Sequence, residues 1–159
     1  MPSKQSTPME KANVIAPPPL IFATALGLGL LAWRVDPRPM LPPTVALWLG
    51  VALCVLSFVV AGSALYELRK AGTPVDPSKP TTAIVRTGAY HFSRNPLYVA
   101  LTMLYLGVAA LLNAPWIAVL IVPVLVVMRF GVIGREERYL DRKFGNTYRH
   151  YRTEVRRWL

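Results

Sequence analysis

The chain has 159 residues, enough for one domain, and 53% of them are hydrophobic while only 16% are charged. Soluble domains carry about a quarter charged residues and do not need their apolar residues in long runs, so this composition indicates an integral membrane protein. A net charge of +10 would suit a nucleic-acid-binding protein, but the distribution of the charges, described below, argues against a nucleic-acid partner.

Two apolar runs in the first half predict membrane spans, at 20–35 and 44–66. The preceding segment, 1–17, is polar and proline-containing, and we expect it to be flexible and cytoplasmic. A signal peptide or an interfacial helix is the alternative for 20–35, although no clear small-x-small cleavage site follows it. Small residues recur at four-residue spacing in both runs, a pattern that lets helices pack closely in lipid: Ala23 and Gly27, Ala25 and Gly29, and Ala46, Gly50 and Cys54. We therefore interpret both spans as scaffold.

The chain offers little for redox or metal chemistry. Cys54 is the only cysteine and lies within an apolar run, so an intrachain disulfide is impossible. The two histidines, His91 and His150, have no cysteine near them. We therefore expect no structural metal site.

A long polar loop, 67–96, connects the second run to the third. Its glycine and prolines rule out one continuous helix, although 81–85 suits a short extended piece. The loop ends in a polar and aromatic cluster, GAYHFSRNPLY, at 88–98. Pro96 suits the first turn of a helix, and Asn95 is the natural N-cap before it.

The third and fourth apolar runs, 97–113 and 115–134, are predicted to form a tight membrane hairpin, because Asn113, Ala114 and Pro115 are the only link between them. Pro123 should kink the fourth span. The C-terminal segment, 135–159, is predicted to be helical and cytoplasmic. Its first helix should end near Phe144, where Gly145 and Asn146 are plausible terminators. A second amphipathic turn is expected at 148–158.

The basic residues are concentrated on one side of these spans. Two precede the first span, five lie in the loop between the second and third, and eight follow the fourth, whereas the loop at 36–43 and the hairpin turn hold almost none. The positive-inside rule then places both termini and the 67–96 loop in the cytoplasm. Such charges can hold anionic lipid headgroups, so a lipid surface explains the charge better than nucleic acid does.

A hairpin returns the chain to the side it left, so the cluster at 88–98 should meet a second cluster, REERYLDRKFGNTYRHY, at 135–151. Arg94 alone reads as a membrane-interface anchor, but its neighbours gather donors and aromatic rings around a guanidinium that can grip a carboxylate. Glu136 and Glu137 point about 100° apart on a helix, so one could face a pocket and the other water. Arg129, two turns earlier, would share roughly their face or snorkel to the interface.

Together the two clusters resemble the isoprenylcysteine carboxyl methyltransferase family, with its bacterial relatives and the phospholipid methyltransferases. The resemblance covers about 72–159. The residues that carry it are Gly88, Tyr90, Arg94, Pro96 and Tyr98, then Asn113 and Pro115 in the turn, then Glu136, Glu137, Leu140, Phe144, Gly145, Tyr148, Tyr151 and Val155. The chain departs from the family at Asn95, where the family has His, and at Val132, where it tends to place Arg.

The resemblance implies an all-α integral membrane enzyme of about four spans, forming a single domain at 18–159 in a bacterial inner membrane. It implies S-adenosylmethionine-dependent methyl transfer to a lipophilic or membrane-associated acceptor, either a carboxylate, an amine or a thiol. We expect Arg94 and Glu137 to be catalytic, with Arg94 pairing with the cofactor carboxylate and Glu137 as candidate base for an amine. The expected cofactor-binding residues are Tyr90, His91, Arg94, Asn95, Tyr98, Glu136, Glu137 and Tyr148.

Two other functions fit the sequence. One is a membrane reductase that uses NADPH, because some sterol reductases share a related C-terminal architecture and need no glycine-rich dinucleotide motif. The other is a non-catalytic membrane scaffold, in which Arg94 and Glu137 would have no chemical role.

Overall fold

The computed structural model describes residue 12, residues 14–76 and residues 79–159, and this described part is helical, with connecting loops and no strand. The extended piece expected at 81–85 is accordingly an irregular loop. In chain order the helices are α1 (Pro18–Val35), α2 (Pro43–Lys70), the 3-10 helix η1 (Gly88–His91), α3 (Pro96–Leu111), α4 (Pro115–Val119), α5 (Ile121–Val127), the π-helix η2 (Met128–Ile133), α6 (Gly134–Phe144) and α7 (Asn146–Glu154).

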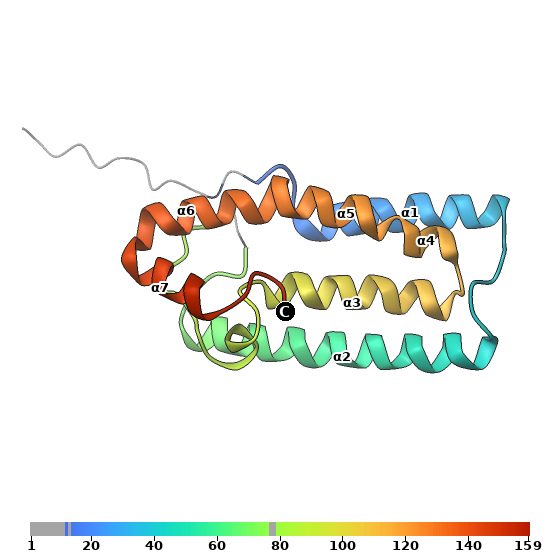
Figure 1. The fold of residues 1–159 in the computed structure, drawn as a ribbon, viewed down its shortest axis with the longest axis horizontal. Coiled ribbons are helices and arrows are strands. Elements are labelled where there is room, and N and C mark those ends of the chain that lie inside the picture. The colour runs from blue at the N-terminus through green and yellow to red at the C-terminus, as the bar shows by residue number, and fades with distance from the viewer. Residues whose placement is uncertain (1–11, 13, 77–78) are drawn as a thin grey trace, which may run out of the picture.

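The long helices lie side by side in an elongated bundle (Figure 1). Three helical stretches are long and apolar enough to cross a membrane, Pro18–Val35, Pro43–Lys70 and Pro115–Phe144, while the apolar α3 is shorter, at 16 residues. The apolar part of the last stretch ends at Ile133, and the polar α6 continues it, so we treat α6 as lying outside the membrane. The chain is thus a helical membrane protein, as its composition predicted.

Proline begins each of these helices. Pro18, Pro43, Pro96 and Pro115 occupy the first helical position of α1, α2, α3 and α4. At that position the missing N–H has no intrahelical partner to lose, and the proline ring presets φ for the helix. The first span therefore begins two residues earlier than the apolar run suggested.

The predicted hairpin is present, with α3 and the α4–α5 stretch running in opposite directions (Figure 1). Its turn contains Asn113, whose φ of +50° lies in the left-handed region that asparagine tolerates. The Asn113 carboxamide accepts hydrogen bonds from the N–H groups of Met40 and Leu41, both 3.0 Å, and donates one of 2.8 Å to the Leu41 carbonyl. These bonds fasten the hairpin turn to the α1–α2 loop.

Pro123 interrupts the fourth span as predicted. The helix breaks at Leu120, between α4 and α5. Since Pro123 has no N–H to donate to the carbonyl four residues earlier, the carbonyl of Val119 loses its helical partner there.

Close helix packing uses only some of the small residues. A Cβ atom added to Gly107 of α3 would lie 2.7 Å from Cys54 Sγ, and one added to Gly50 of α2 would lie 2.6 Å from Leu111 Cγ. Gly29 is similarly close to Ile117, at 2.8 Å, whereas nothing lies within 4 Å of the same atom on Gly27. The packing role expected of the four-residue pattern therefore holds for Gly29 and Gly50 but not for Gly27.

The π-helix η2 changes which residues share a face. Its i→i+5 hydrogen bonding takes about one more residue per turn than an α-helix, which shifts the phase of everything that follows. Arg129 is exposed while Glu137 is buried, so the expectation that the two share a face was wrong. The sequence argument assumed an unbroken 3.6-residue period across this segment.

The N-terminal segment packs on this π-helix. The N–H of Ile15 donates to the carbonyl of Gly131 at 3.3 Å, and the Ile15 side chain fills the space above that glycine. Ala12 is buried as well. Of the segment expected to be flexible, residues 1–11 and 13 lie outside the described residues, while Ala12 is buried and 14–17 range from half-buried to exposed.

The C-terminal region folds back over the polar end of the bundle. Helix α6 ends at Phe144, where Gly145 adopts a φ of +50°, as its role of terminator predicted. The following helix was expected at 148–158, but α7 spans Asn146–Glu154, and 155–159 forms a tail without helical structure. The N–H of Arg94 donates to the Arg156 carbonyl at 2.9 Å, because the tail runs back along the start of α3.

Candidate functional site

A cavity with an accessible volume of about 140 Å³ lies at the polar end of the bundle, between the loop before α3 and helices α6 and α7. It is lined by Tyr90, Arg94, Asn95, Tyr98, Glu136, Glu137 and Tyr148. These are the predicted cofactor-binding residues except His91. The His91 ring is exposed, lies edge-on to Phe92 and does not line the cavity. The hairpin therefore brings the two sequence clusters together.

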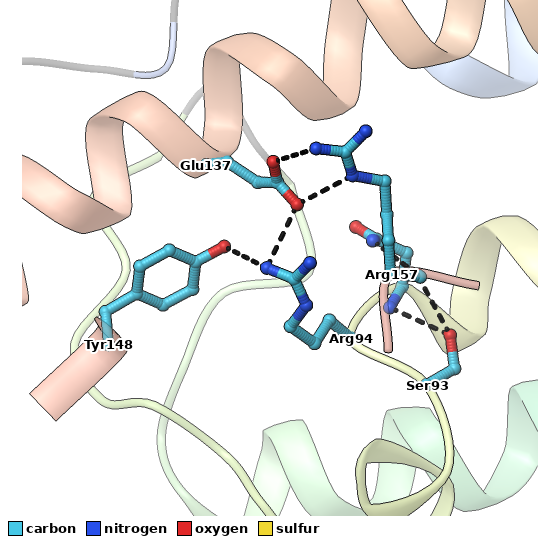
Figure 2. Close-up of polar contacts among 6 residues, drawn as sticks. Ser93, Arg94, Glu137, Tyr148 and Arg157 are labelled. Atoms are coloured by element: carbon cyan, nitrogen blue, oxygen red, sulfur yellow. Dashed lines mark hydrogen bonds and ion pairs between the residues drawn. The ribbon is translucent and has the colours of Figure 1, made fainter. Parts of the chain in front are cut away.

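Glu137 lies at the centre of an ion-pair cluster that Figure 2 shows. Its Oε1 is 3.1 Å from Arg94 Nη1 and accepts a hydrogen bond of 2.9 Å from Arg157 Nε, while its Oε2 accepts one of 2.6 Å from Arg157 Nη2. The side chains of Arg94 and Glu137 are only 8% and 11% exposed. Paired, charge-assisted bonds of this kind are among the stronger and more directional contacts in proteins.

The guanidinium of Arg94 has a buried N–H donor, at Nε, that is not hydrogen-bonded within the described part of the chain. Its Nη1 donates to the Tyr148 hydroxyl at 3.1 Å as well as facing Glu137. Its Nε is buried and has no hydrogen-bond partner among the described residues. A buried, unpaired guanidinium N–H is costly, and an acceptor bound in the cavity would satisfy it.

Arg157 is the site residue that sequence reasoning missed. The tail is held by its own backbone, because the Arg157 carbonyl accepts hydrogen bonds from Asn95 Nδ2 at 2.9 Å and from Ser93 Oγ at 3.3 Å. Asn95 therefore occupies the predicted N-cap position, but its side chain donates to the tail and makes no hydrogen bond to the first turn of α3. Backbone contacts do not depend on a spacing pattern of side chains, so the sequence does not show where the tail docks. The positive charge of Arg157 was the only sequence signal that it could pair with an acid.

Glu136 also faces the cavity, which corrects the expectation that one of the two glutamates would face water. Its Oε1 accepts a hydrogen bond of 2.5 Å from the Tyr98 hydroxyl. Burial raises the pKa of Glu136 to about 7, opposed by the Tyr98 hydrogen bond and supported by the nearby charge of Glu137. The contacts of the two acids differ, since Glu137 meets guanidinium groups and Glu136 meets a neutral hydroxyl.

Buried tyrosines form the remaining wall of the cavity. The Tyr151 hydroxyl donates to the Tyr90 carbonyl at 2.7 Å, and Tyr148 and Tyr151 are 2% and 3% exposed. Burial is the main cause that raises the pKa of Tyr90, Tyr148 and Tyr151, so these phenols stay neutral and act as flat, uncharged surfaces. The cavity thus combines guanidinium donors, carboxylate acceptors and aromatic rings, which suits a zwitterionic ligand that carries a ring.

Two comparisons with known proteins place the chain among its relatives. A family model described as phospholipid methyltransferase matches residues 45–147. An uncharacterized protein from Haemophilus influenzae is 42% identical over 65 residues, which are 40% of this chain and the whole of that relative. No solved structure matches the chain. The family match includes the hairpin and the residues of the cavity up to α7.

Proposed function

The chain belongs to the phospholipid methyltransferase family, and from that premise we propose that it transfers a methyl group from S-adenosylmethionine to a lipophilic or membrane-associated acceptor. The observation that carries this proposal is the cavity lined by Arg94, Glu137, Glu136 and Tyr98 at the end of a membrane hairpin, in which Glu137 is also paired with Arg157. Family membership makes the chain a methyltransferase of the membrane, and the cofactor, the acceptor and the residue roles below are our proposal.

The residues of the cavity fit the cofactor's functional groups. The unpaired Nε of Arg94 matches the need of a carboxylate for guanidinium donors. Glu136 would accept from the ribose hydroxyls or the ammonium group, and Tyr90, Tyr98 or Tyr148 would pack on the adenine. When bound, the cofactor supplies an activated methyl group on a sulfonium.

The chain's own contribution is alignment and exclusion of water. Methyl transfer is an in-line displacement that neutralises the sulfonium, so it depends on holding donor and acceptor in line more than on a strong base. Arg94 is fixed for this task by Glu137 and Tyr148, and Arg157 of the tail holds Glu137 in turn.

The structure supports a different base from the one the sequence suggested. Both oxygens of Glu137 are held by guanidinium groups, so we assign Glu137 the role of positioning Arg94. Glu136 makes one hydrogen bond, to Tyr98, and its pKa of about 7 suits a group that exchanges a proton near neutrality. An amine acceptor would lose its proton to Glu136, whereas a carboxylate or thiolate acceptor needs no base.

The topology belongs to the same proposal. We propose four spans, with α3 as the short third one. The start of α1, the tail 155–159 and the described part of the loop before α3 then lie toward one end of the bundle, where the basic residues are concentrated (Figure 1). The positive-inside rule makes that end cytoplasmic, in a bacterial inner membrane, with 18–159 as a single domain. The acceptor then enters laterally from the lipid.

Titration calorimetry with S-adenosylhomocysteine tests the proposal. We expect saturable binding of one ligand per chain in detergent and in nanodiscs, with NADPH, the cofactor of the reductase alternative, as the matched negative control. Absence of binding in both media would contradict the proposal, and so would tighter binding of NADPH. Incubating the enzyme with lipid extracts and methyl-labelled cofactor, followed by mass spectrometry, would then identify the acceptor.

A further inference from the structure

A second pocket lies on the other side of α6 from the cofactor cavity. It has an accessible volume of about 550 Å³ and is formed by α6 and α7. Its lining includes four arginines and two acids: Arg135, Arg138, Arg142, Arg152, Glu137 and Asp141. We refer to it as the arginine pocket. The proposed methyl transfer makes no use of these arginines.

The acids of this pocket are already neutralised by arginines that do not line it. Asp141 receives hydrogen bonds from Arg149 Nε at 2.8 Å and Nη2 at 3.3 Å, and this contact lowers the pKa of Asp141 below its usual range. Glu137 is held by Arg94 and Arg157. The lining itself holds four arginines against two acids, so it carries an excess of positive charge on a concave surface, a combination that selects an anion.

The pocket also lies at a defined depth. Its first arginine follows directly on Gly134, which itself follows the last apolar residue of the span, Ile133. At 1.5 Å of rise per residue, Arg135 and Arg138 lie within about 8 Å of the end of the apolar segment, which is the depth of lipid phosphates. Arg138 Nε donates to the Gly134 carbonyl at 3.0 Å, so its side chain turns back toward the membrane.

We propose that the arginine pocket binds the headgroup of an anionic bilayer phospholipid through its phosphate, at a site separate from the methyl acceptor. Guanidinium groups match phosphate geometry through paired hydrogen bonds, and the depth of the pocket selects a phosphate carried by a lipid over one free in solution. A bound headgroup fastens α6 and α7 to the membrane surface and so steadies the wall of the cofactor cavity. The proposal does not depend on methyl transfer.

Thermal unfolding of the full chain in a neutral detergent tests this site. We expect added dioleoylphosphatidylglycerol to raise the melting temperature by about 3 °C or more, because a ligand that binds only the folded state stabilises it. Dioleoylphosphatidylcholine and inorganic phosphate at the same concentration should each give less than half of that shift. An equal shift with phosphatidylcholine, or with inorganic phosphate, would overturn the proposal.

A matched pair of double variants separates the pocket from general surface charge. Arg138→Gln with Arg152→Gln removes two exposed arginines from the pocket and should abolish more than half of the phosphatidylglycerol shift. Arg69→Gln with Arg156→Gln removes two exposed arginines elsewhere at the same end and should keep the shift. Equal losses in both would overturn the proposal. Retained binding of S-adenosylhomocysteine shows that the variants are folded.

Native mass spectrometry of the unaltered chain gives a second measurement that needs no variant. We expect one phosphatidylglycerol molecule to stay bound at collision energies that strip phosphatidylcholine. Equal retention of both lipids, or loss of both together, would contradict a headgroup site.

Discussion

Glu137 shows how a single buried acid can organise a site. Its carboxylate meets two guanidinium groups, that of Arg94 just before α3 and that of Arg157 in the C-terminal tail, so a change at this residue affects both segments. Removing one partner of a buried ion pair typically costs about 3–5 kcal/mol, because the remaining charge stays buried without compensation. Loss of activity in Glu137→Ala would therefore confound folding with function, and milder substitutions are more informative.

Arg94→Lys is such a substitution. Lysine keeps the positive charge that Glu137 needs but cannot offer the planar fork or the Nε donor. We expect the affinity for S-adenosylhomocysteine, measured by calorimetry, to fall at least about tenfold, corresponding to the loss of roughly one charge-assisted hydrogen bond. Arg156→Lys, an exposed residue of the tail, is the control and should bind as the unaltered chain does. Unchanged affinity in Arg94→Lys would remove Arg94 from the carboxylate site.

Glu136 predicts a dependence of stability on pH. A free glutamate carboxyl titrates near 4.5, and Glu136 in the folded chain titrates at about 7. Between these pH values the folded chain binds more protons than the unfolded chain, so the free energy of unfolding falls as pH rises. We expect the melting temperature to decrease between pH 5 and pH 8, and to decrease less in Glu136→Gln. A matching slope in Glu136→Gln would show that Glu136 is not responsible.

At the residue scale the sequence was informative where residues are close along the chain. Arg94, Tyr98, Glu136 and Glu137 could be grouped because a hairpin of known direction joins their segments. Arg157 could not, because a five-residue tail can dock in many places and only tertiary contacts select one. For the same reason the sequence suggested that Asn95 would cap α3, whereas in the structure its side chain binds the tail carbonyl.

At the scale of the element, the close approach of α2 and α3 depends on glycines, which have no side chain, at the contact between the two helices. Gly50→Val should lower the melting temperature strongly, since the nearest Leu111 atom lies 2.6 Å from the position of a Cβ, and overpacking costs about 1–3 kcal/mol. Gly62→Val on the same helix is the matched control, because nothing lies within 4 Å of its added Cβ. Both changes remove a glycine from a helix, so the difference between them measures the packing contact. Equal melting temperatures would contradict this account of the α2–α3 contact.

Helix starts and breaks were predictable because proline determines them locally. Pro96 and Pro115 begin helices, and Pro123 lies three residues after the break at Leu120, whatever the rest of the fold does. The π-helix was not predictable in this way. One additional residue in a helical turn leaves no signal in the composition. The π-helix packs against Ile15, which is far away in sequence, so its position could not be read from the local residues.

At the scale of the whole molecule, the chain closes on itself at the polar end. Ending the chain after Glu154 removes Arg157 and the backbone contacts of 155–159, so we expect binding of S-adenosylhomocysteine to be lost or weakened by more than about tenfold. Ending it after Arg157 retains those contacts and should preserve binding. Calorimetry on both shortened chains makes the comparison, with circular dichroism to verify helical content. Full binding by the shorter chain would show that the tail is dispensable.

The general plan of the molecule followed from its apolar runs, and the joining of its two polar clusters followed from the hairpin. What the sequence did not supply was the relation between α6, α7 and the tail. These segments are polar overall, so membrane burial does not fix their positions. The ion pairs of Glu137 do so instead, together with the packing of Tyr148, Tyr151 and Val155 against Leu140 and Phe144.

The hydrogen bonds of Asn113 have a mechanical consequence. They fasten the hairpin turn to the α1–α2 loop, and Trp116 Nε1 adds a hydrogen bond of 3.1 Å to the Asp36 carbonyl there. If this end stays fixed while the stretch 115–133, about 28 Å long, tilts by about 5°, the other end of the stretch moves by about 2.5 Å. Such a tilt would be smallest at the fastened turn and largest toward Glu137, so a movement of this stretch would change the cofactor cavity more than the hairpin turn.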